Sequence, residues 1–178
     1  MRITGGTLSG RKLSVPKLPD VRPTTERARE SLLNWLSNRI DFSTCSITEL
    51  FAGTGVVSFE MISRGCPKAI CVDIQSVCCQ TISSIAQKWN LPVEVVCADA
   101  FHFIEHAQPV GLVFADPPYR LPLLHTLPQK IMSSALLTNG GILILEHDQT
   151  YNFGDLIGYK ESRRYGEGVF SIFEVLST

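Results

Sequence analysis

The chain has 178 residues, 44% of them hydrophobic, and a formal net charge of −1, a composition that excludes a disordered polypeptide and leaves room for one globular domain. Its longest apolar runs, such as residues 142–145, are too short to cross a bilayer, and no secretory h-region follows Met1. None of the six cysteines belongs to a Cys-x-x-Cys pair, which disfavours a zinc site. We therefore expect a cytoplasmic protein with reduced thiols, no membrane contact and no bound metal.

The small net charge conceals an asymmetry along the chain. Residues 1–40 carry eight Lys and Arg against three Asp and Glu, whereas the remainder carries eight basic residues against fourteen acidic ones. A basic segment on an acidic body is typical of a surface that binds a polyanion. A solvated charged face would explain the same composition equally well, so charge alone leaves both interpretations open.

Residues 1–20 contain Gly and Pro at short intervals, a pattern that predicts a hairpin or an extended arm. A helix is predicted next, with Thr24 as its N-cap and Glu26 in its first turn. Its apolar residues recur every three or four positions, at Ala28, Leu32, Trp35 or Leu36, and Ile40. We treat residues 1–40 as a small basic N-terminal arm and residues 41–178 as the main domain.

After residue 46 short apolar runs alternate with helical segments. The runs are Ile47–Phe51, Ala69–Asp73, Val93–Ala98, Val110–Ala115 and Ile142–Glu146. The helical segments are Val56–Arg64, Ser76–Lys88, Ala100–Ala107 and roughly Leu121–Leu137. This alternation predicts a doubly wound α/β fold, with a mostly parallel sheet buried on both faces by helices. A turn at residues 163–168, followed by Val169–Leu176, predicts a closing antiparallel hairpin.

Ligands of such a sheet bind beyond the carboxyl ends of its strands. The first predicted strand leads into the turn Ala52-Gly53-Thr54-Gly55, whose glycines allow a tight turn and close approach of a ligand to the backbone. Carboxylates mark the ends of four consecutive strands: Glu49, Asp73, Asp99 and Asp116. The sequence therefore predicts an acidic ligand site at one edge of the sheet.

The position of each carboxylate predicts its partner in a bound nucleoside cofactor. Asp73 lies about twenty residues past the glycine turn, which suits hydrogen bonds from ribose hydroxyls. Asp99 is expected near an adenine amino group, with Ile74 or Phe101 against the ring. Glu49 is expected beneath the glycine turn, facing the positively charged end of the cofactor. The predicted cofactor-binding residues are Glu49, Phe51, Ala52, Gly53, Thr54, Gly55, Asp73, Ile74, Asp99, Ala100 and Phe101.

The negative charge of this edge indicates the class of cofactor. It repels a pyrophosphate and suits the sulfonium and ammonium groups of S-adenosylmethionine, and the turn lacks the Gly-x-Gly-x-x-Gly of dinucleotide-binding proteins. Each feature alone also has a structural explanation, because Asp73 and Asp99 could cap helices and a proline ends a strand. Their coincidence at successive strand ends favours a cofactor site.

The fourth strand ends in Asp116-Pro117-Pro118-Tyr119, which we predict to be the catalytic segment. The lone pair of an exocyclic amine is delocalised into its base, and acceptors for the two amine hydrogens localise that pair on the nitrogen. Asp116 and the carbonyl of Pro117, held by two stiff prolines, are the predicted acceptors, and Tyr119 stacks on the unstacked base. We give no catalytic role to His102, His106, His125 or His147, and no Pro-Cys pair offers a cysteine nucleophile.

Two motifs and the N-terminal sequence together resemble the RsmD-like 16S rRNA guanine-N2 methyltransferases of bacteria. The motifs are Phe51-Ala52-Gly53-Thr54-Gly55 and Asp116-Pro117-Pro118-Tyr119, and the N-terminal match covers residues 1–6, 10–13, 22–27, 29–30 and 34–36. The Asp-Pro-Pro-Tyr motif is shared with adenine-N6 methyltransferases. The Arg-Pro-Thr block at residues 22–24 is the discriminating part.

The resemblance implies a seven-stranded class I methyltransferase fold, S-adenosylmethionine as cofactor, and N2 methylation of a guanine in the 16S rRNA of the small ribosomal subunit or its assembly intermediate. We expect a monomer. The N-terminal arm is expected to bind the RNA, with candidate contacts at Arg2, Arg11, Lys12, Arg22, Thr24 and Arg27. The alternatives are an adenine-N6 methyltransferase of DNA or RNA, a non-catalytic RNA-binding assembly factor, and an NAD-dependent enzyme, which the turn sequence disfavours.

Overall fold

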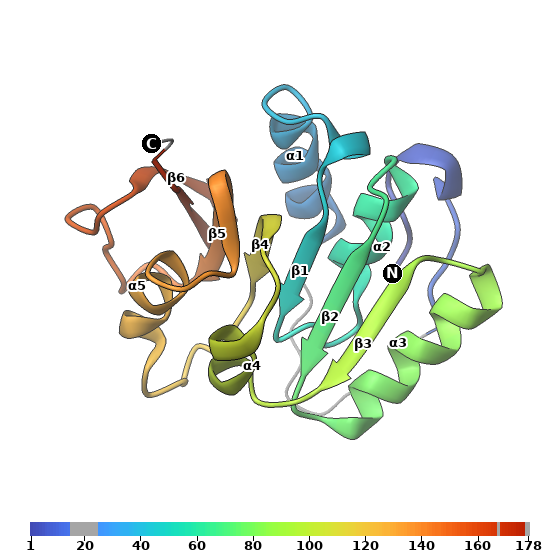
Figure 1. Ribbon diagram of the computed structural model, residues 1–178. Coiled ribbons are helices and arrows are strands. Elements are labelled where there is room, and N and C mark those ends of the chain that lie inside the picture. The colour runs from blue at the N-terminus through green and yellow to red at the C-terminus, as the bar shows by residue number, and fades with distance from the viewer. Residues whose placement is uncertain (15–24, 167, 177–178) are drawn as a thin grey trace.

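The computed structural model of the chain describes residues 1–14, 25–166 and 168–176, and within them the apolar runs form one seven-stranded sheet (Figure 1). The strands are β1 (Ile47–Leu50), β2 (Ala69–Asp73), β3 (Val93–Cys97), β4 (Val110–Ala115), β5 (Leu137–His147), β6 (Tyr159–Tyr165) and β7 (Gly168–Glu174). Their order is β3-β2-β1-β4-β5-β7-β6, and β7 runs antiparallel to both of its neighbours. The predicted parallel sheet with a closing hairpin is confirmed.

Helices cover both faces of the sheet. They are α1 (Glu26–Leu36), α2 (Val56–Ser63), α3 (Ser76–Trp89), α4 (Ala100–His106) and α5 (Leu127–Met132), with short 3-10 turns at η1 (Gly6–Leu8), η2 (Phe42–Thr44) and η3 (Leu124–Thr126). Leu32, Phe59 and Ile82, from the first three helices, belong to one buried apolar cluster on one face. Ile104 and Ile131, from α4 and α5, belong to a second cluster on the other face. Strand side chains alternate between the two clusters, which explains why the runs are apolar throughout.

Residues 1–14 form the predicted hairpin around η1. The Ile3 amide donates to the carbonyl of Arg11 at 3.0 Å, and the Leu13 amide donates to the carbonyl of Met1 at 3.1 Å. The side chains of Ile3 and Leu13 are buried in the same cluster as α1 and the sheet. These described parts of the N-terminal arm therefore share one buried cluster with α1 and the sheet.

Several predicted boundaries differ from the structure. β5 begins at Leu137, five residues before the predicted run, and α1 ends at Leu36 although its apolar spacing continues to Ile40. The N-cap of α1 is Thr25, whose hydroxyl accepts from the Ala28 amide at 3.2 Å, and not Thr24, which lies outside the described residues. The helix predicted over residues 121–137 is reduced to η3 and α5. Pro128 lacks an amide hydrogen and occupies the first turn of α5, so a regular helix cannot run through it from upstream.

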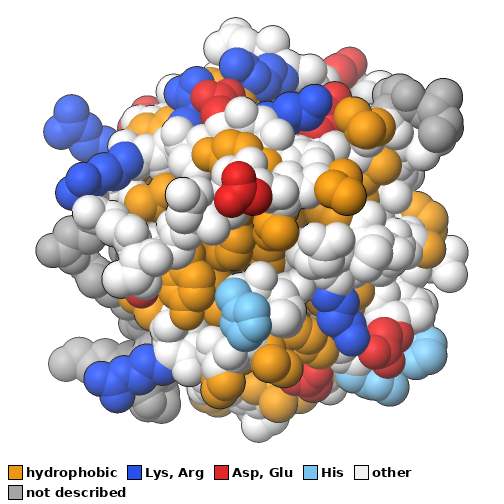
Figure 2. Space-filling model, turned by 90° about the vertical axis from the view of Figure 1, so that its left-hand side faces the viewer, with side chains coloured by type: hydrophobic (Ala, Val, Ile, Leu, Met, Phe, Trp, Pro, Cys, Tyr) orange, Lys and Arg blue, Asp and Glu red, His pale blue; other side chains and the backbone are white. Residues whose placement is uncertain are grey.

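No helix in the described part of the chain is long and apolar enough to cross a membrane. Figure 2 shows the side of the molecule that carries α5 and β6, where hydrophobic side chains occupy the centre and Lys and Arg side chains lie mostly toward the edges. Leu123 and Ile157, in segments that precede η3 and β6, are among the exposed large hydrophobic side chains. Basic side chains therefore do not form one continuous surface on this side.

Candidate active site

A cavity of about 620 Å³ lies at the carboxyl ends of the first four strands, the lower end of the sheet in Figure 1. Its volume falls within the range of about 300–1,000 Å³ that small-molecule sites occupy. Its lining residues are Glu49, Phe51, Ala52, Gly53, Thr54, Val56, Val57, Val72, Asp73, Ile74, Gln75, Ala98, Asp99, Ala100, Phe114, Asp116, Pro117, Pro118, Tyr119 and Arg120. The structure thus brings the glycine turn, the strand-end carboxylates and the Asp-Pro-Pro-Tyr segment together around one space.

The turn between β1 and α2 depends on backbone conformations that favour glycine. Gly53 and Gly55 have φ angles of 52° and 70°, and a Cβ atom on Gly55 would lie 3.0 Å from Cγ1 of Ile82. Phe51 also has a positive φ, 56°, which an L-residue adopts only when its surroundings impose it. These conformations expose backbone of the turn to the cavity, while Gly55 itself serves as the N-cap residue of α2.

Glu49 is buried at the end of β1, with 3% of its surface exposed. One of its oxygens accepts from the Ser58 amide in the first turn of α2 at 2.7 Å. Desolvation by burial raises the pKa of this carboxyl to about 7, even though the hydrogen bonds to Ser58 lower it. Burial therefore favours the neutral form of Glu49, and a nearby cation would favour its charged form.

Asp73 connects the glycine turn to β2. Its Oδ2 accepts from the Gly53 amide at 2.7 Å, and its Oδ1 accepts from the Gln75 amide at 2.8 Å. It does not cap α3, whose N-cap position is Gln75. Asp99 does cap its helix, because its Oδ1 accepts from the His102 amide at 3.0 Å at the start of α4. Both carboxylates line the cavity, so capping and ligand binding are compatible for Asp99.

Two of the predicted cofactor residues do not line the cavity. Gly55 faces Ile82 below the turn, and Phe101 packs against the apolar cluster of α4 and α5, with Nζ of Lys130 lying 5.8 Å from its ring centre. Ile74 does line the cavity, and 69% of its surface is exposed. Of the two apolar residues considered for the ring, the structure therefore brings Ile74 to the cavity.

Several lining residues were missing from the sequence prediction: Val56, Val57, Val72, Gln75, Ala98, Phe114 and Arg120. Most are apolar residues of strands or helix starts, and their sequence pattern does not distinguish them from core. Arg120 was the one with a usable signal, because it directly follows the Asp-Pro-Pro-Tyr segment. It adds a positive charge at the side of the cavity where a nucleic-acid substrate is expected.

The Asp-Pro-Pro-Tyr segment continues directly from β4. The Asp116 amide donates to the carbonyl of Leu50 at 3.4 Å, and the Leu121 amide donates to the carbonyl of Pro118 at 2.8 Å, closing a turn after the motif. Burial, followed by the charges of Glu146 and Glu49, raises the pKa of Asp116 well above its usual range. Asp116 is therefore a buried carboxyl whose charge is further disfavoured by Glu146 and Glu49.

The basic residues of the N-terminal arm differ in their surroundings. Nε of Arg2 pairs with Glu26 at 3.0 Å, and the guanidinium of Arg11 lies 4.8 Å from the ring centre of Trp89. Lys12 and Arg27 are exposed. Arg22 and Thr24 lie outside the described residues, so nothing tests the expectation that they contact RNA.

Arg29 is buried, unlike the exposed basic residues of the N-terminal arm. Only 1% of its surface is exposed, and its Nε pairs with Glu60 of α2 at 3.0 Å. One of its terminal nitrogens donates to the carbonyl of Arg2 at 2.7 Å. Its charge is thus compensated inside the protein and is not available to a polyanion.

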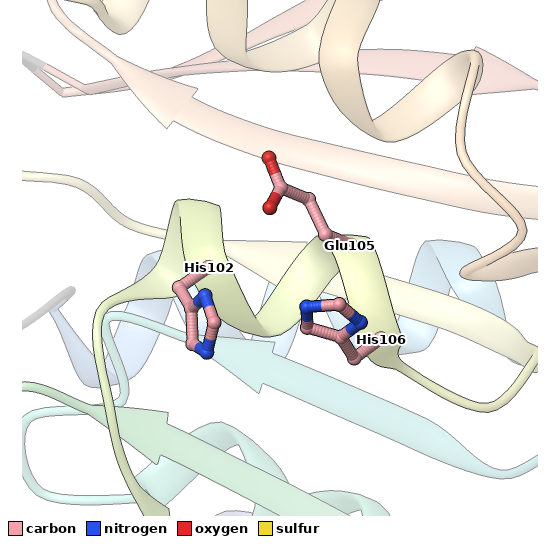
Figure 3. Close-up of side chains that lie close together, drawn as sticks. All are labelled: His102, Glu105 and His106. Carbon is pink, nitrogen blue, oxygen red and sulfur yellow. The ribbon is translucent and has the colours of Figure 1, made fainter.

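None of the four histidines, all of which lie in the described part of the chain, lines the cavity. His102 and His106 lie one turn apart on α4 with ring centres 5.1 Å apart, and Figure 3 shows Glu105 directed away from them. The ligand atoms of these three exposed residues lie within 4.8 Å of one another. We assign no metal to this cluster, because the carboxylate of Glu105 pairs with Lys130 at 2.7 Å.

Comparisons with known proteins agree with this arrangement. A family model described as "Conserved hypothetical protein 95" matches residues 1–174. The chain is 34% identical over 150 residues to "Ribosomal RNA small subunit methyltransferase D" of Escherichia coli strain K12, covering 83% of this chain and 75% of that protein. It is 29% identical over 150 residues to the protein of the same name in Buchnera aphidicola subsp. Acyrthosiphon pisum, covering 83% and 78%.

Two solved structures show the same fold. The structure of yhhF from Escherichia coli superimposes with a TM-score of 0.86 at 26% identity, covering 100% of this chain and 99% of that one. An RNA methyltransferase from Salinibacter ruber, solved in complex with S-adenosyl-L-homocysteine, superimposes with a TM-score of 0.68 at 13% identity, covering 88% and 95%. The second likeness supports the fold alone.

Proposed function

This chain belongs to the protein family described as Conserved hypothetical protein 95, and from that premise we propose that it methylates the exocyclic N2 amine of a guanine in 16S rRNA. The fold is that of class I methyltransferases, and the cofactor is S-adenosylmethionine. The observation that carries the proposal is the joining of an acid-lined cavity to Asp116-Pro117-Pro118-Tyr119 at one edge of the sheet. The guanine target and the roles of individual residues are what we propose beyond family and cofactor.

The residues around the cavity suit this cofactor chemically. Asp73 and Asp99 offer acceptors for ribose hydroxyls and for an adenine amino group, and Ile74 offers an apolar surface for the ring. The carboxyl of Glu49, with a pKa of about 7, gains its charge when a cation lies nearby. A cavity with this lining favours sulfonium and ammonium groups over a pyrophosphate.

The Asp-Pro-Pro-Tyr segment is proposed to prepare the amine. When bound, S-adenosylmethionine supplies the methyl group. An oxygen of Asp116 and the carbonyl of Pro117 accept the two amine hydrogens, which localises the nitrogen lone pair and aims it at the cofactor. Tyr119 stacks on the unstacked base, and Asp116 takes the proton that the amine would lose as its nitrogen gains the methyl group and the methyl–sulfur bond of the cofactor breaks.

The RNA surface is proposed to include the N-terminal arm. The hydroxyl of Thr54, in the glycine turn, donates to Sδ of Met1 at 3.5 Å, so the start of the arm lies beside the cavity. We propose Arg2, Arg11, Lys12, Arg22, Thr24 and Arg27 as RNA contacts, with Arg120 as an addition from the structure. The substrate is the small ribosomal subunit or its assembly intermediate.

Transfer of radiolabelled methyl groups to small ribosomal subunits from a strain that lacks the modification tests this proposal, with naked DNA as the second substrate. The wild-type protein is expected to label the RNA. Asp116→Ala should reduce labelling by at least about 100-fold, because one hydrogen-bond acceptor of the amine is lost. Asp155→Ala, at an exposed carboxylate away from the cavity, serves as the matched control.

Each contrary result identifies an alternative. Labelling of DNA alone would favour an adenine-N6 DNA methyltransferase. Binding of subunits without any labelling would favour a non-catalytic assembly factor. Full labelling by Asp116→Ala would refute the role of the segment.

A further inference from the structure

Glu146, near the end of β5, lies close to Asp116, which directly follows the last residue of β4. The register of β4 and β5 pairs Ala115 with Leu145, so Asp116 and Glu146 are the residues that follow this last pair. Neighbouring strands are about 4.8 Å apart, and side chains alternate between the faces of a sheet. Because Phe114 and Ile144 share one face, the side chains of Asp116 and Glu146 leave the sheet on that same face.

The carboxylate of Glu146 is buried and occupies space left by a neighbouring glycine. Only 7% of its surface is exposed. A Cβ atom on Gly168, at the start of β7, would lie 3.1 Å from Oε1 of Glu146, so the glycine leaves the room that this carboxylate occupies. The charge of Glu146 is the larger of the two that raise the pKa of Asp116, which agrees with their closeness. A second acidic group therefore stands next to the proposed amine acceptor.

The Watson–Crick edge of guanine presents two kinds of donor side by side, the N1–H and the N2 amine. Adenine presents an unprotonated N1, an acceptor, next to its N6 amine. We propose that Glu146 accepts a hydrogen bond from N1–H of the target guanine while Asp116 holds the N2 amine, so that the pair selects guanine over adenine. This inference rests on the proposed function, and it assigns to Glu146 the choice of base that the Asp-Pro-Pro-Tyr segment alone leaves open.

This role is compatible with other contacts of Glu146 in the protein. A carboxylate has about four lone-pair positions, so it can keep a protein donor and still accept from a base. A fixed carboxylate also disfavours a base whose N1 is unprotonated, because two hydrogen-bond acceptors then face each other in a buried site. Selection thus combines one attractive and one repulsive contact.

The test compares two nucleotides that share the 2-amino group and differ at N1 and C6. Guanosine 5′-monophosphate has N1–H and a 6-oxo group, whereas the 5′-monophosphate of 2-aminopurine riboside has an unprotonated N1 and no 6-oxo group, so the effect of N1 is read from how the Glu146 variants change the ratio of the two affinities. Both are titrated, with adenosine 5′-monophosphate as a third probe, into the complex of the protein with S-adenosylhomocysteine. NMR shift changes give the dissociation constants of the wild-type protein, Glu146→Gln, Glu146→Asp and the control Glu94→Gln, an exposed acid on β3.

We expect the wild-type protein and Glu94→Gln to prefer the guanine nucleotide over the 2-aminopurine nucleotide by about tenfold or more. Glu146→Gln should reduce this ratio to within about twofold, because an amide can turn either its oxygen or its nitrogen toward N1. Glu146→Asp keeps the charge but moves it back by one methylene, so an intermediate ratio is expected. Unchanged affinity for S-adenosylhomocysteine shows that the cavity of each variant is intact.

The contrary outcomes separate this inference from the function on which it rests. If the wild-type protein prefers the adenine nucleotide, the guanine assignment itself fails. If it prefers guanine and Glu146→Gln keeps the full ratio, Asp116 alone takes both donors and the role of Glu146 is refuted. Equal or unmeasurable binding of the guanine and 2-aminopurine nucleotides by the wild-type protein contradicts the inference as well. If Glu146→Gln does not fold, an unchanged ratio in Glu146→Asp refutes it.

Discussion

Asp116 occupies an unusual electrostatic position for a residue that is expected to accept hydrogen bonds. Burial and the charges of Glu146 and Glu49 raise its pKa well above its usual range, so Asp116 holds a proton more readily than a carboxyl in water does. A protonated carboxyl has lost part of its acceptor capacity. The arrangement therefore links the proposed chemistry to pH.

The ionised form of Asp116 is the better acceptor, and it is lost as the pH falls through the raised pKa. We expect kcat/KM for small ribosomal subunits to decline on the acidic side of that pKa, and the decline to begin at a higher pH than an ordinary Asp would give. Asp116→Asn keeps one acceptor without this titration, so its activity should be lower at high pH and its profile flatter. An Asp116→Asn profile with the same acidic limb as the wild-type protein would contradict this assignment.

Glu49 predicts a pH effect on stability. Because its pKa is raised from 4.5 to about 7 in the folded chain, folding favours the neutral acid, and stability is lost as the pH rises from about 4.5 through 7. That loss corresponds to about 3 kcal/mol at most above pH 7. Glu49→Gln keeps the acceptor for the Ser58 amide without the charge. Urea unfolding at pH 8 should show the variant to be more stable than the wild-type protein by about 1–3 kcal/mol, with no gain at pH 4.

The same variant is expected to bind S-adenosylmethionine more weakly, since a cation loses its ionised neighbour. Isothermal titration at pH 8 measures this effect, and Glu94→Gln serves as a control of equal charge change. A Glu49→Gln variant that is no more stable at pH 8 and binds the cofactor as tightly as the wild-type protein would show that Glu49 is not a buried, cation-facing acid.

For individual residues, the sequence could place those site residues whose position follows from strand geometry alone. Gly53 follows β1 and Asp73 ends β2, and parallel strands bring such ends to one edge, so their closeness follows from the predicted sheet, whereas the hydrogen bond between them was not predicted. The choice between Ile74 and Phe101 depended on how α4 is rotated, which local sequence does not determine. Glu146 was missed because it ends an apolar run and carries no motif, and only the register of β5 places it beside Asp116.

Among the helices and strands, a buried ion pair connects α1 and α2, and the amino-acid composition could not reveal it. Arg29 on α1 pairs with Glu60 on α2, and Glu60 also accepts from the amides of Thr4 at 2.7 Å and Gly5 at 3.3 Å. Sequence counted Arg29 as part of a basic arm, because the partner lies 31 residues away and burial is not visible in composition. The pair joins the N-terminal hairpin, α1 and α2.

Removing one member of this ion pair should lower the stability of the fold. Arg29→Met leaves the buried charge of Glu60 with only the more distant guanidinium of Arg64, whose Nε lies 3.7 Å away, and is expected to lower the free energy of unfolding by about 3–5 kcal/mol. Arg27→Met, at an exposed position on the same helix, should change it by less than about 0.5 kcal/mol. Urea unfolding measures both values. Equal stability of the two variants would mean that the pair does not connect these elements.

The first and last residues of the helices and strands could be predicted from the sequence only in part. Strands β1 to β4 were predicted to within one residue at each end, because each is a short apolar run flanked by turns, whereas β5 begins five residues before its predicted start. α5 was overestimated, because its apolar residues extend into the start of β5 at Leu137 and only Pro128 marks the boundary. The N-cap of α1 was displaced by one residue since Thr24 and Thr25 are equally good caps by type.

At the scale of the whole molecule, a basic arm lies beside an acidic cofactor cavity. Met1 contacts Thr54 of the glycine turn, and Arg120 lines the cavity. We propose that the arm and Arg120 hold the RNA backbone, while the carboxyl groups act on the base and the cofactor. This division keeps the negative charge of the phosphates away from the carboxylates at the strand ends.

A salt titration tests the arm. Each phosphate contact that is lost should reduce the slope of log K against log salt by about 0.7–0.9. The triple variant Arg11→Gln, Lys12→Gln and Arg27→Gln should therefore bind small ribosomal subunits more weakly and lower this slope by about 2. A triple variant at Lys68, Lys160 and Arg164, three exposed basic residues outside the arm, controls for net charge. Equal slopes for the two triple variants would place the RNA elsewhere.

The fold could be predicted almost completely, because the alternation of strands and helices admits few topologies. The antiparallel position of β7 between β5 and β6 required the structure, since a hairpin in sequence does not say which of its strands joins the sheet. The site could be predicted as an edge of the sheet with named carboxylates. The residues that β5 contributes to the site could not be predicted, because they depend on how strands far apart in the sequence pair with each other.

The central claim is that this chain methylates the N2 amine of a guanine in 16S rRNA through Asp116. Small ribosomal subunits that lack the modification are incubated with the protein and S-adenosylmethionine, and the methylated nucleoside is identified and mapped on the rRNA by mass spectrometry. We predict N2-methylguanosine at one position, formed by the wild-type protein and by Asp155→Ala but not by Asp116→Ala. N6-methyladenosine, or no methylated nucleoside with protein that binds the cofactor, would contradict this claim.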